Sequence, residues 1–342
     1  GSPTGGTFSG SGVNSTTGIF TPLTAGIGTH KITYTYSDAK GCSDTASQTI
    51  TVNGLPAVTL SALPAVCAGS PAFALTGGSP ASGTYSGTGV NSTTGTFTPG
   101  TATAGTHAIT YSFTDGNSCS NTATQNIVVN AQPIVTLGNF TDVCIDNGLV
   151  SLTTGLPTPG VYSGTGVTGT NFNPLTAASG THTITYKHTD GNSCTDSASK
   201  TIVVNALPVV SLTGLSPVCV NASSVTLSGG SPTGGTFSGS GVNSTTGVFT
   251  PSTAGVGSHK VTYTYSDAKG CSDTASQTIN VNALPGVTLS AISAVCSGSP
   301  SFSLIGGSPA SGTYSGTGVN STTGIFTPGT ATAGTHAITY SF

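Results

Sequence analysis

The eight cysteines are the residues of this chain best suited to chemistry, because they recur at regular spacing. Short gaps, such as that from Cys42 to Cys67, alternate with gaps about twice as long, such as that from Cys67 to Cys119. No pair has the C-x₂-C spacing of a zinc site. The pattern therefore favours structural disulfides, formed in an oxidising compartment, over metal binding or redox chemistry. The eight are Cys42, Cys67, Cys119, Cys144, Cys194, Cys219, Cys271 and Cys296.

Histidines and aspartates recur in the same way. Five histidines stand about 75 residues apart, too far to meet at one metal ion, so we expect each ring to pack locally. Paired aspartates flank a turn without acidic neighbours, whereas calcium takes six to eight oxygen ligands and a glycosidase pair needs a cleft. We therefore expect these carboxylates to cap turns. The residues are His30, His107, His182, His259 and His336, and Asp38 with Asp44, Asp190 with Asp196, and Asp267 with Asp273.

Glycine-rich runs such as Gly-Thr-Tyr-Ser-Gly-Thr-Gly could suggest a phosphate-binding loop. However, no Lys-Ser/Thr pair or helix signal follows them. They are better interpreted as strands bent by glycine. The serines have no neighbouring base or orienting acid. The sequence thus predicts no catalytic, cofactor-binding or metal-binding residue, and no enzyme activity.

Two nested repeats position these residues. Residues 1–113 reappear as 230–342, and the glycine-rich blocks recur every 75–77 residues. This period is too long for a solenoid repeat and matches a small domain. A proline in each joining segment suits a strand start or hinge. The sequence predicts complete repeats at 54–130, 131–205 and 206–282, with partial repeats at 1–53 (first strands missing) and 283–342 (last strand missing).

Composition and alternation indicate the fold class. Thr, Val, Ile and Tyr are plentiful, while Glu, Arg, Met and Trp are absent. About seven short strands in each repeat predict an all-β tandem array of small Ig-like antiparallel β-sandwich domains. In the repeat 206–282 the expected strands are Val209–Leu212, Ser224–Leu227, Gly235–Val242, Val248–Thr250, His259–Tyr265 and Cys271–Val281.

The predicted boundaries place one disulfide inside each complete repeat. Each would tie the start of the second strand to the beginning of the last. Closing a loop of about 50 residues stabilises a domain by roughly 4 kcal/mol in the chain-entropy model. The alternative joins Cys42 to Cys67, and their equivalents, across each boundary. The expected pairs are Cys67–Cys119, Cys144–Cys194 and Cys219–Cys271.

Three motifs recur in every complete repeat: Val-Cys near its start, a Gly-Thr/Ser-His-x-Ile/Val-Thr-Tyr strand, and Gly-Cys or Ser-Cys before the last strand. They resemble the PKD-like and Ig-like repeats of very large cell-surface and secreted proteins in Bacteroidota. The Trp-Asp-Phe-Gly-Asp signature of ordinary PKD domains is absent, so the resemblance is to the PKD-like branch. It implies an array similar to gliding adhesins and other products of the type IX secretion pathway.

The resemblance extends to a modification motif. Asp followed by Ser or Thr and a small apolar residue resembles the O-glycosylation acceptor of Bacteroidota. It implies glycans at Thr45, Ser197 and Thr274.

Charge and hydropathy exclude several classes of function. A net charge of −3 leaves no basic face for nucleic acid or anionic lipid, and no apolar run is long enough to predict a membrane span. The chain opens within a repeat at Gly1, so we expect it to be a segment of a longer protein. The leading hypothesis is a non-enzymatic segment of a giant extracellular or cell-surface protein, forming a stalk or filament for adhesion or reach.

Two alternatives stay open. One is a multivalent array that binds surface carbohydrate through many weak sites; the other is a spacer attached to an enzyme domain outside this segment. The short proline-containing steps between repeats predict a stiff array. The scarcity of lysine predicts lateral packing, either between distant repeats or between copies of the chain, because lysine commonly guards strand edges.

Overall fold

The fold is built from short strands and single-turn helices. The computed structural model describes residues 1–342, and its helices are no longer than four residues. None of them is long and apolar enough to cross a membrane. The prediction of an all-β chain is confirmed.

The chain divides into two compact units that interleave along the sequence. The middle repeat contributes residues to both. We keep the five predicted ranges below as names for the repeats. The first unit comprises 1–141, 149–177 and 181–202, and the second comprises 142–148, 178–180 and 203–342.

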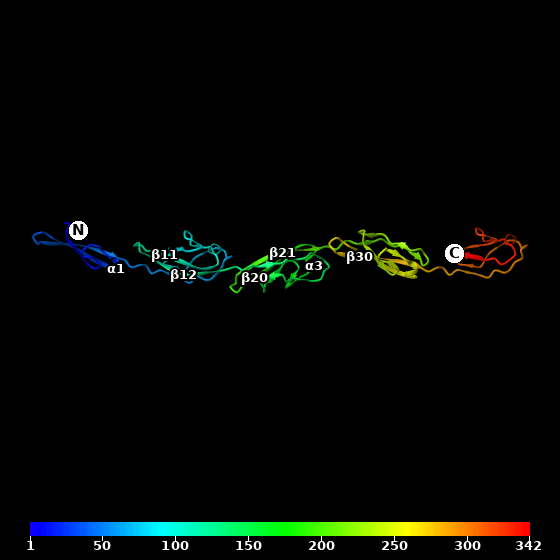
Figure 1. The fold of residues 1–342 in the computed structure, drawn as a ribbon, viewed down its shortest axis with the longest axis horizontal. Helices are drawn as coiled ribbons and strands as arrows, with labels where there is room; N and C mark the ends of the chain where they lie inside the picture. Colours follow the sequence, from blue (N-terminus) through cyan, green and yellow to red (C-terminus); the bar gives the residue numbers. More distant parts are fainter. The chain divides into compact units, whose positions relative to one another are not determined.

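The repeat 54–130 shows how the strands pair. Its longest feature is the antiparallel hairpin of β11 (Gly105–Thr114) and β12 (Ser120–Asn130), with partners from Gly105↔Val129 to Thr114↔Ser120 (Figure 1). This hairpin is the centre of a four-stranded sheet in the order β5-β12-β11-β8. β8 (Thr84–Ser86) is antiparallel to β11, whereas β5 (Val66–Cys67) is parallel to β12.

Shorter strands form the opposite layer of the same repeat. β10 (Thr96–Phe97) lies between β6 (Phe73–Ala74) and β9 (Val90–Asn91), and β4 (Thr59–Leu60) pairs with β7 (Gly78–Ser79). The two layers enclose one apolar core. The antiparallel sandwich is therefore confirmed, with the two-residue parallel pairing of β5 as an addition.

Alternation along the strands explains which side chains form the core. Successive residues of a strand point to opposite faces, so Ile109 and Tyr111 of β11 share one face, as do Ile127 and Val129 of β12. All four are at most 2% exposed. They pack in one cluster with Leu60, Leu75, Phe97 and Ala102.

Tyr111 explains the glycines of the Gly-Thr-Tyr-Ser blocks. Its hydroxyl donates to the Pro80 carbonyl at 2.5 Å and accepts from the Gly83 N–H at 2.7 Å. A Cβ at Gly78 would lie 2.6 Å from the ring. The ring therefore occupies space that only glycine leaves free. Equivalent hydroxyl bonds tie Tyr34 to Pro3, Tyr263 to Pro232 and Tyr340 to Pro309.

A single helical turn precedes each long hairpin. In α2 (Pro99–Ala102) the proline stands at the first position, where its missing N–H costs nothing, and Ala102 is buried. The turn thus returns the chain from the short-strand layer to β11. Its counterparts are α1 (Pro22–Ala25), α3 (Pro174–Ala177), α4 (Pro251–Ala254) and the 3₁₀ turn η1 (Pro328–Thr330).

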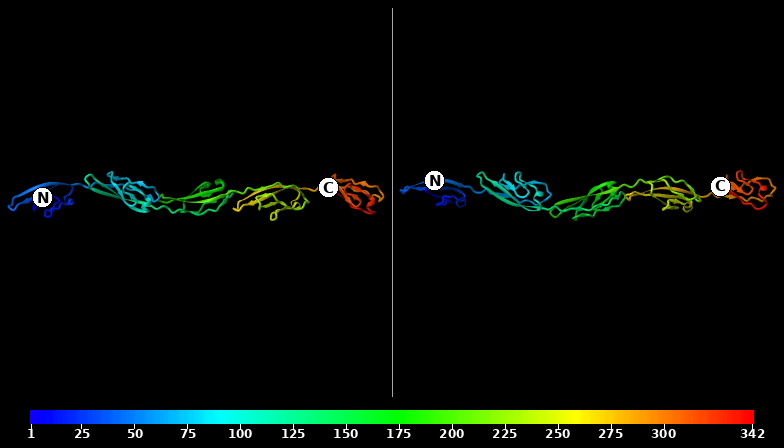
Figure 2. Two further views of the ribbon diagram at one scale, coloured as in Figure 1. Left: turned by 90° about the horizontal axis from the view of Figure 1, so that it is seen from above. Right: turned by 45° about the horizontal axis from the view of Figure 1, so that its top comes forward.

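The repeat 206–282 has a strand at each predicted place and adds β23 and β25. The predicted strand Gly235–Val242 is divided into β26 and β27, which belong to different sheets. Most strands are shorter than expected, because only the central hairpin pairs along its whole length. Figure 2 shows the same contrast of long hairpin and short strands from two further directions. The elements are β22 (Ser211–Leu212), β23 (Val218–Cys219), β24 (Val225–Thr226), β25 (Gly230–Ser231), β26 (Thr236–Gly239), β27 (Val242–Asn243), β28 (Val248–Phe249), β29 (Gly257–Ser266) and β30 (Ser272–Asn282).

The middle repeat has the same elements. β17 pairs with β20 as β8 pairs with β11, and β14 lies parallel to β21 as β5 lies parallel to β12. Its strands are β13 (Thr136–Leu137), β14 (Val143–Cys144), β15 (Val150–Ser151), β16 (Gly155–Leu156), β17 (Val161–Ser163), β18 (Val167–Thr168), β19 (Asn171–Phe172), β20 (Gly180–Thr189) and β21 (Thr195–Asn205).

The two end repeats contain only part of this arrangement. The first has the hairpin but lacks the strands equivalent to β4, β5 and β6; the last has the short strands but lacks an equivalent of β12. The first contains β1 (Thr7–Ser9), β2 (Gly28–Ser37) and β3 (Ser43–Val52). The last contains β31 (Thr288–Leu289), β32 (Phe302–Ser303), β33 (Gly307–Ser308), β34 (Thr313–Gly316), β35 (Val319–Asn320), β36 (Ile325–Phe326) and β37 (Ile338–Ser341).

Candidate inter-repeat junction

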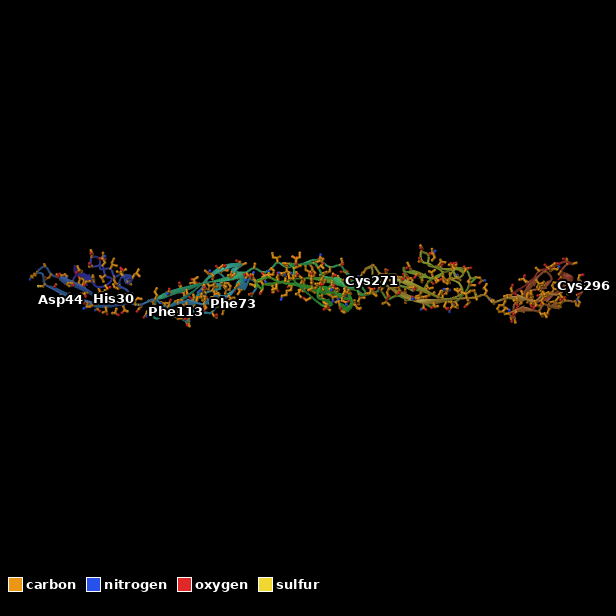
Figure 3. All side chains as sticks on the ribbon, turned by 90° about the horizontal axis from the view of Figure 1, so that it is seen from below. His30, Asp44, Phe73, Phe113, Cys271 and Cys296 are labelled. Carbon is orange, nitrogen blue, oxygen red and sulfur yellow. A yellow bond between two sulfur atoms is a disulfide. The ribbon has the colours of Figure 1, made fainter.

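The histidines fasten local turns. His107 Nε2 lies 3.0 Å from the Thr103 carbonyl at the end of α2, and His30 makes the equivalent 2.8 Å contact with Gly26. His259 and His336 repeat it. His30 lies in the first repeat in Figure 3. No group of three or more histidines, cysteines or acids in residues 1–342 is arranged to hold a metal ion.

The first aspartate of each predicted pair, which precedes the hairpin-tip cysteine, caps the turn as predicted. The second lies in the following strand and accepts from the N–H of the next residue instead. Asp190 Oδ1 accepts from the N–H groups of Asn192 at 2.9 Å and Cys194 at 2.8 Å. Asp38, Asp115 and Asp267 make the same two contacts in their own turns. The carboxylate thus fixes the direction in which the following cysteine leaves the hairpin.

The residue before each of these cysteines completes the turn. Gly41 and Gly270 have φ of 83° and 84°, and Ser118 and Ser193 have φ of 66° and 64°. This left-handed conformation favours glycine. The tip therefore has a fixed shape in every hairpin, whether its cysteine is bonded or free.

Two disulfides join neighbouring repeats. Cys67 of the repeat 54–130 is bonded to Cys194 of the next repeat, and Cys144 of the middle repeat is bonded to Cys271 of the repeat 206–282. Both bonds span 127 residues, with Cα atoms 5.5 and 5.6 Å apart. Each joins the cysteine of a parallel edge strand to the cysteine at the tip of the next hairpin.

The predicted pairs Cys67–Cys119, Cys144–Cys194 and Cys219–Cys271 are wrong in this structure. The reason is the parallel pairing of β5 with β12, which places Cys67 opposite Asn130 at the end of β12. Cys119 stands before the first residue of that strand. Eleven strand residues span roughly 36 Å, whereas a disulfide needs Cα atoms within about 7 Å.

The alternative pairing across each boundary is wrong as well. Cys194 is bonded to Cys67, so it is not available to Cys219, and Cys144 is bonded to Cys271 rather than Cys119. Four cysteines remain free. Cys42, Cys219 and Cys296 are exposed, and Cys119 is half-buried.

The first junction is closely packed. Cys194 is fully buried, and the Gln132 side chain donates to the Thr195 carbonyl at 3.3 Å. A Cβ at Gly69 would meet the Gln132 amide. Gln132 was not singled out from the sequence; the signal was that glutamine replaces the leucine of Leu55, Leu207 and Leu284 in the joining segments.

The residues of the glycosylation motif lie on the hairpins. Thr45 of β3, Ser197 of β21 and Thr274 of β30 are exposed. In each motif the aspartate accepts from the N–H of the following residue, for example Asp44 Oδ1 from Thr45 at 2.7 Å. Modification of these residues stays a prediction.

Comparison with known proteins gives similarities of fold only. No family model matches the chain, and no curated protein matches it. Similar solved structures include an adhesin of an Antarctic bacterium described as Ca²⁺-stabilised and ice-binding (14% identity, 75% of this chain and 82% of the adhesin, TM-score 0.29). Another is Sidekick-1 immunoglobulin domains 1–5, with 12% identity, coverage of 75% of this chain and 67% of the Sidekick-1 chain, and a TM-score of 0.20. Because both TM-scores are below 0.5, the fold assignment rests on the strand pairing described above.

Proposed function

We propose that this chain is a non-enzymatic structural segment of a giant extracellular repeat protein, forming a stiff stalk or filament for surface adhesion or mechanical reach. The observation that carries the proposal is the pair of disulfides between consecutive repeats. A bond inside one domain stabilises that domain alone. A bond between two domains also limits how they move against each other.

The same bonds support an extracellular location. Structural disulfides persist in oxidising surroundings and are rare in the cytosol. The Val-Cys, Gly-Thr-His and Gly-Cys motifs support a finer proposal, that the protein belongs with the type IX secretion products of Bacteroidota. Exposed Thr45, Ser197 and Thr274 are open to a glycosyltransferase, which fits that assignment.

We also propose that 54–130, 131–205 and 206–282 are separate domains. The repeat 54–130 has a core cluster drawn from its own strands, and the repeat 206–282 has another around Phe249 and Val261. A core of its own is what defines a domain.

Self-association is the proposed partnership. β8 is the last strand of the sheet β5-β12-β11-β8, so its outer edge is unpaired in that sheet, and such an edge is a template for another strand. The whole chain has only six lysines to guard its edges. Electron microscopy of native material tests this: threads one repeat wide, with neither lateral nor helical packing, would contradict it.

Glycan binding is the weaker proposal. Carbohydrate-binding arrays favour exposed aromatic platforms, yet all ten tyrosines are buried or half-buried. Several stack in pairs inside the repeats, such as Tyr85 on Tyr111 with ring centroids 4.7 Å apart. Glycan-array screening of the chain would reveal any binding.

Small-angle scattering of the oxidised chain tests the stalk. A compact globule of 342 residues has a radius of gyration of about 20 Å. Ten-residue hairpin strands span about 33 Å, so five repeats arranged end to end predict a value above about 40 Å. Cys67→Ser should lower the radius by adding flexibility, and Cys219→Ser, which removes a free thiol, is the matched control. A radius matching the compact globule for the oxidised chain would overturn the proposal.

A further inference from the structure

The two bonded junctions differ in the edge loop, the three residues that follow each edge-strand cysteine. Gly69 stands two residues after Cys67, whereas Asp146 stands two residues after Cys144. The turn is the same in both loops, because the N–H three residues after each cysteine donates to the cysteine carbonyl, at 2.9 and 3.0 Å. Gly69 does not have the positive φ that favours glycine. The backbone therefore does not require a glycine in the first loop.

The Gln132 side chain requires it instead. A Cβ on Gly69 would overlap the Gln132 amide, whose Oε1 would lie 2.7 Å away. Through Nε2 the same amide donates to the Thr195 carbonyl at 3.3 Å, next to the buried Cys194. All of these residues lie within the first compact unit. One side chain thus contacts the edge loop of one repeat and the hairpin of the next.

The edge loop and the following joining segment change together along the chain. A glycine in the loop is followed by a glutamine in the joining segment, and an aspartate or asparagine is followed by a leucine. Both bonded junctions nevertheless reach the same geometry, with Cα atoms 5.5 and 5.6 Å apart. Two combinations of residues therefore build one kind of junction. The pairs are Gly69 with Gln132, Asp146 with Leu207, and Asn221 with Leu284.

The charges beside the two disulfides differ as well. Asp142 and Asp146 each stand two residues from Cys144, and Lys269 stands two residues before its partner Cys271, which is labelled in Figure 3. All three charged side chains are exposed. The hairpin tip that carries a lysine is thus the one bonded to an acidic edge. The equivalent positions of the first junction are uncharged, namely Ala65, Gly69 and Asn192.

We propose that each junction is a matched pair, in which the edge loop of one repeat accepts only one type of following repeat. A glycine loop takes a repeat whose joining segment carries glutamine, and an aspartate or asparagine loop takes one that carries leucine. The long repeat of 1–113 as 230–342 fits this proposal. Duplicating 54–130 alone would place Gly69 before a leucine, and duplicating 131–205 alone would place Asp146 before a glutamine.

A mismatch acts on the disulfide through the position of the hairpin tip. The turn gives Cys194 a fixed direction, since its N–H donates to Asp190 Oδ1 at 2.8 Å. The cysteine therefore reaches Cys67 only while the tip lies against the edge loop. Gly69→Asp would displace the Gln132 amide and break its hydrogen bond. Gln132→Leu would remove the bond without the overlap. Either change lowers the effective concentration of one thiol at the other.

The test measures the equilibrium of each disulfide against glutathione in the full chain. Oxidation moves two electrons and two protons from two cysteine thiols to one glutathione disulfide, which becomes two thiols. The four free cysteines are changed to serine. Alkylation and peptide mapping then give the oxidised fraction of the first disulfide, Cys67–Cys194. The second disulfide, Cys144–Cys271, is the internal control in the same molecule.

Swapping residues between the junctions should weaken the first disulfide and then restore it. Gly69→Asp should lower its equilibrium constant about fivefold or more, and Gln132→Leu about threefold, because each loses a hydrogen bond across the junction. Gly69→Asp/Gln132→Leu copies the second junction and should return the constant to within about twofold of the original. The second disulfide should not change. Single variants without effect, or a double variant as weak as the two losses combined, would overturn the matching.

The second junction provides the reverse test. Leu207→Gln should weaken the second disulfide and leave the first unchanged, and adding Asp146→Gly should restore it. An undisturbed second disulfide in Leu207→Gln would contradict the proposal.

The charge match has a test of its own. Lys269→Asn should weaken the second disulfide about twofold at low ionic strength and less at high ionic strength, where exposed charges are screened. A loss that does not depend on salt would overturn the charge match. The matching rests on the proposed stalk, whose stiffness depends on these junctions. A chain that is elongated in scattering but tolerates every mismatch would refute only the matching.

Discussion

The repeats that the disulfides join and the two end repeats have nearly the same sequence. They differ in how far equivalent residues are buried. Ile127 is fully buried, while the equivalent Ile50 is 40% exposed. Cys194 is fully buried and bonded, while the equivalent Cys42 is exposed and free. Ile127 is covered by strands of its own repeat, whereas the range 1–53 does not contain the equivalents of β4, β5 and β6. The difference teaches that the hairpin of a repeat is buried only where the first strands of that same repeat pack on it.

Removing a link should have the largest effect. Cys67→Ser opens a loop of 127 residues, which costs about 5 kcal/mol in the chain-entropy model. Cys296→Ser in the last repeat should cost nothing measurable. Thermal unfolding under non-reducing conditions gives both values. Equal melting temperatures for the two variants would break the comparison.

Truncating a core side chain should have the next largest effect, and its cost in stability should differ between the two regions. Ile127→Ala creates a cavity in a closed core and should cost about 2–5 kcal/mol, whereas Ile50→Ala should cost less than about 1 kcal/mol. Hydrogen exchange of the amides in β11 and β12, and in β2 and β3, reports each site separately. If Ile50→Ala loosened its hairpin as much as Ile127→Ala, Ile50 would be covered in solution.

A third pair of variants, one in each region, should be destabilised to the same extent. The hydroxyls of Tyr34 and Tyr111 make the same two bonds, to Pro3 and Gly6 and to Pro80 and Gly83. Tyr→Phe at either position should cost about 1–3 kcal/mol, because a part-buried N–H loses its acceptor. Local hydrogen exchange measures both. A much smaller cost at Tyr34 would extend the difference between the regions to local packing.

The smallest effect concerns alkaline pH. Burial raises the pKa of Tyr186 above its ordinary value of 10.0, and the neighbouring Tyr162 raises it further. The folded state therefore holds the proton more tightly than the unfolded state. Its stabilising contribution is complete below pH 10 and falls as pH rises from 10 through the folded pKa. Stability measured across this window should fall less steeply in Tyr186→Phe.

Much of the fold was predictable from local pattern. Strand alternation in His259–Tyr265 and the Asp267–Gly270 turn follow from neighbouring residues, and both are confirmed. The disulfide partners were not predictable in this way. They depend on whether Val-Cys lies parallel or antiparallel to the last strand, which is a long-range choice that moves Cys67 from one end of β12 to the other.

The cysteine count supplied a second, partial signal. Two cysteines per repeat fit bonds within a repeat and bonds between repeats equally well, because both use each cysteine once. The two arrangements differ only in which cysteines have no partner. Bonds within repeats leave Cys42 and Cys296 free, whereas bonds between repeats also leave Cys119 and Cys219 free. The number of unpaired thiols therefore separates the two arrangements where spacing does not.

The overlap of the two bonded loops governs how far the chain can be pulled. The shortest covalent path from Cys67 to Cys271 crosses to Cys194, runs back along the backbone to Cys144 and crosses again. The backbone from Cys67 to Cys144 and from Cys194 to Cys271 lies outside this path. Its length does not add to the extension of the chain while both disulfides are intact. At about 3.4 Å per residue, these roughly 150 residues represent roughly 500 Å of extension that tension cannot release while the sulfur bonds hold. Unfolding these repeats under load would thus lengthen the chain by only a fraction of its contour.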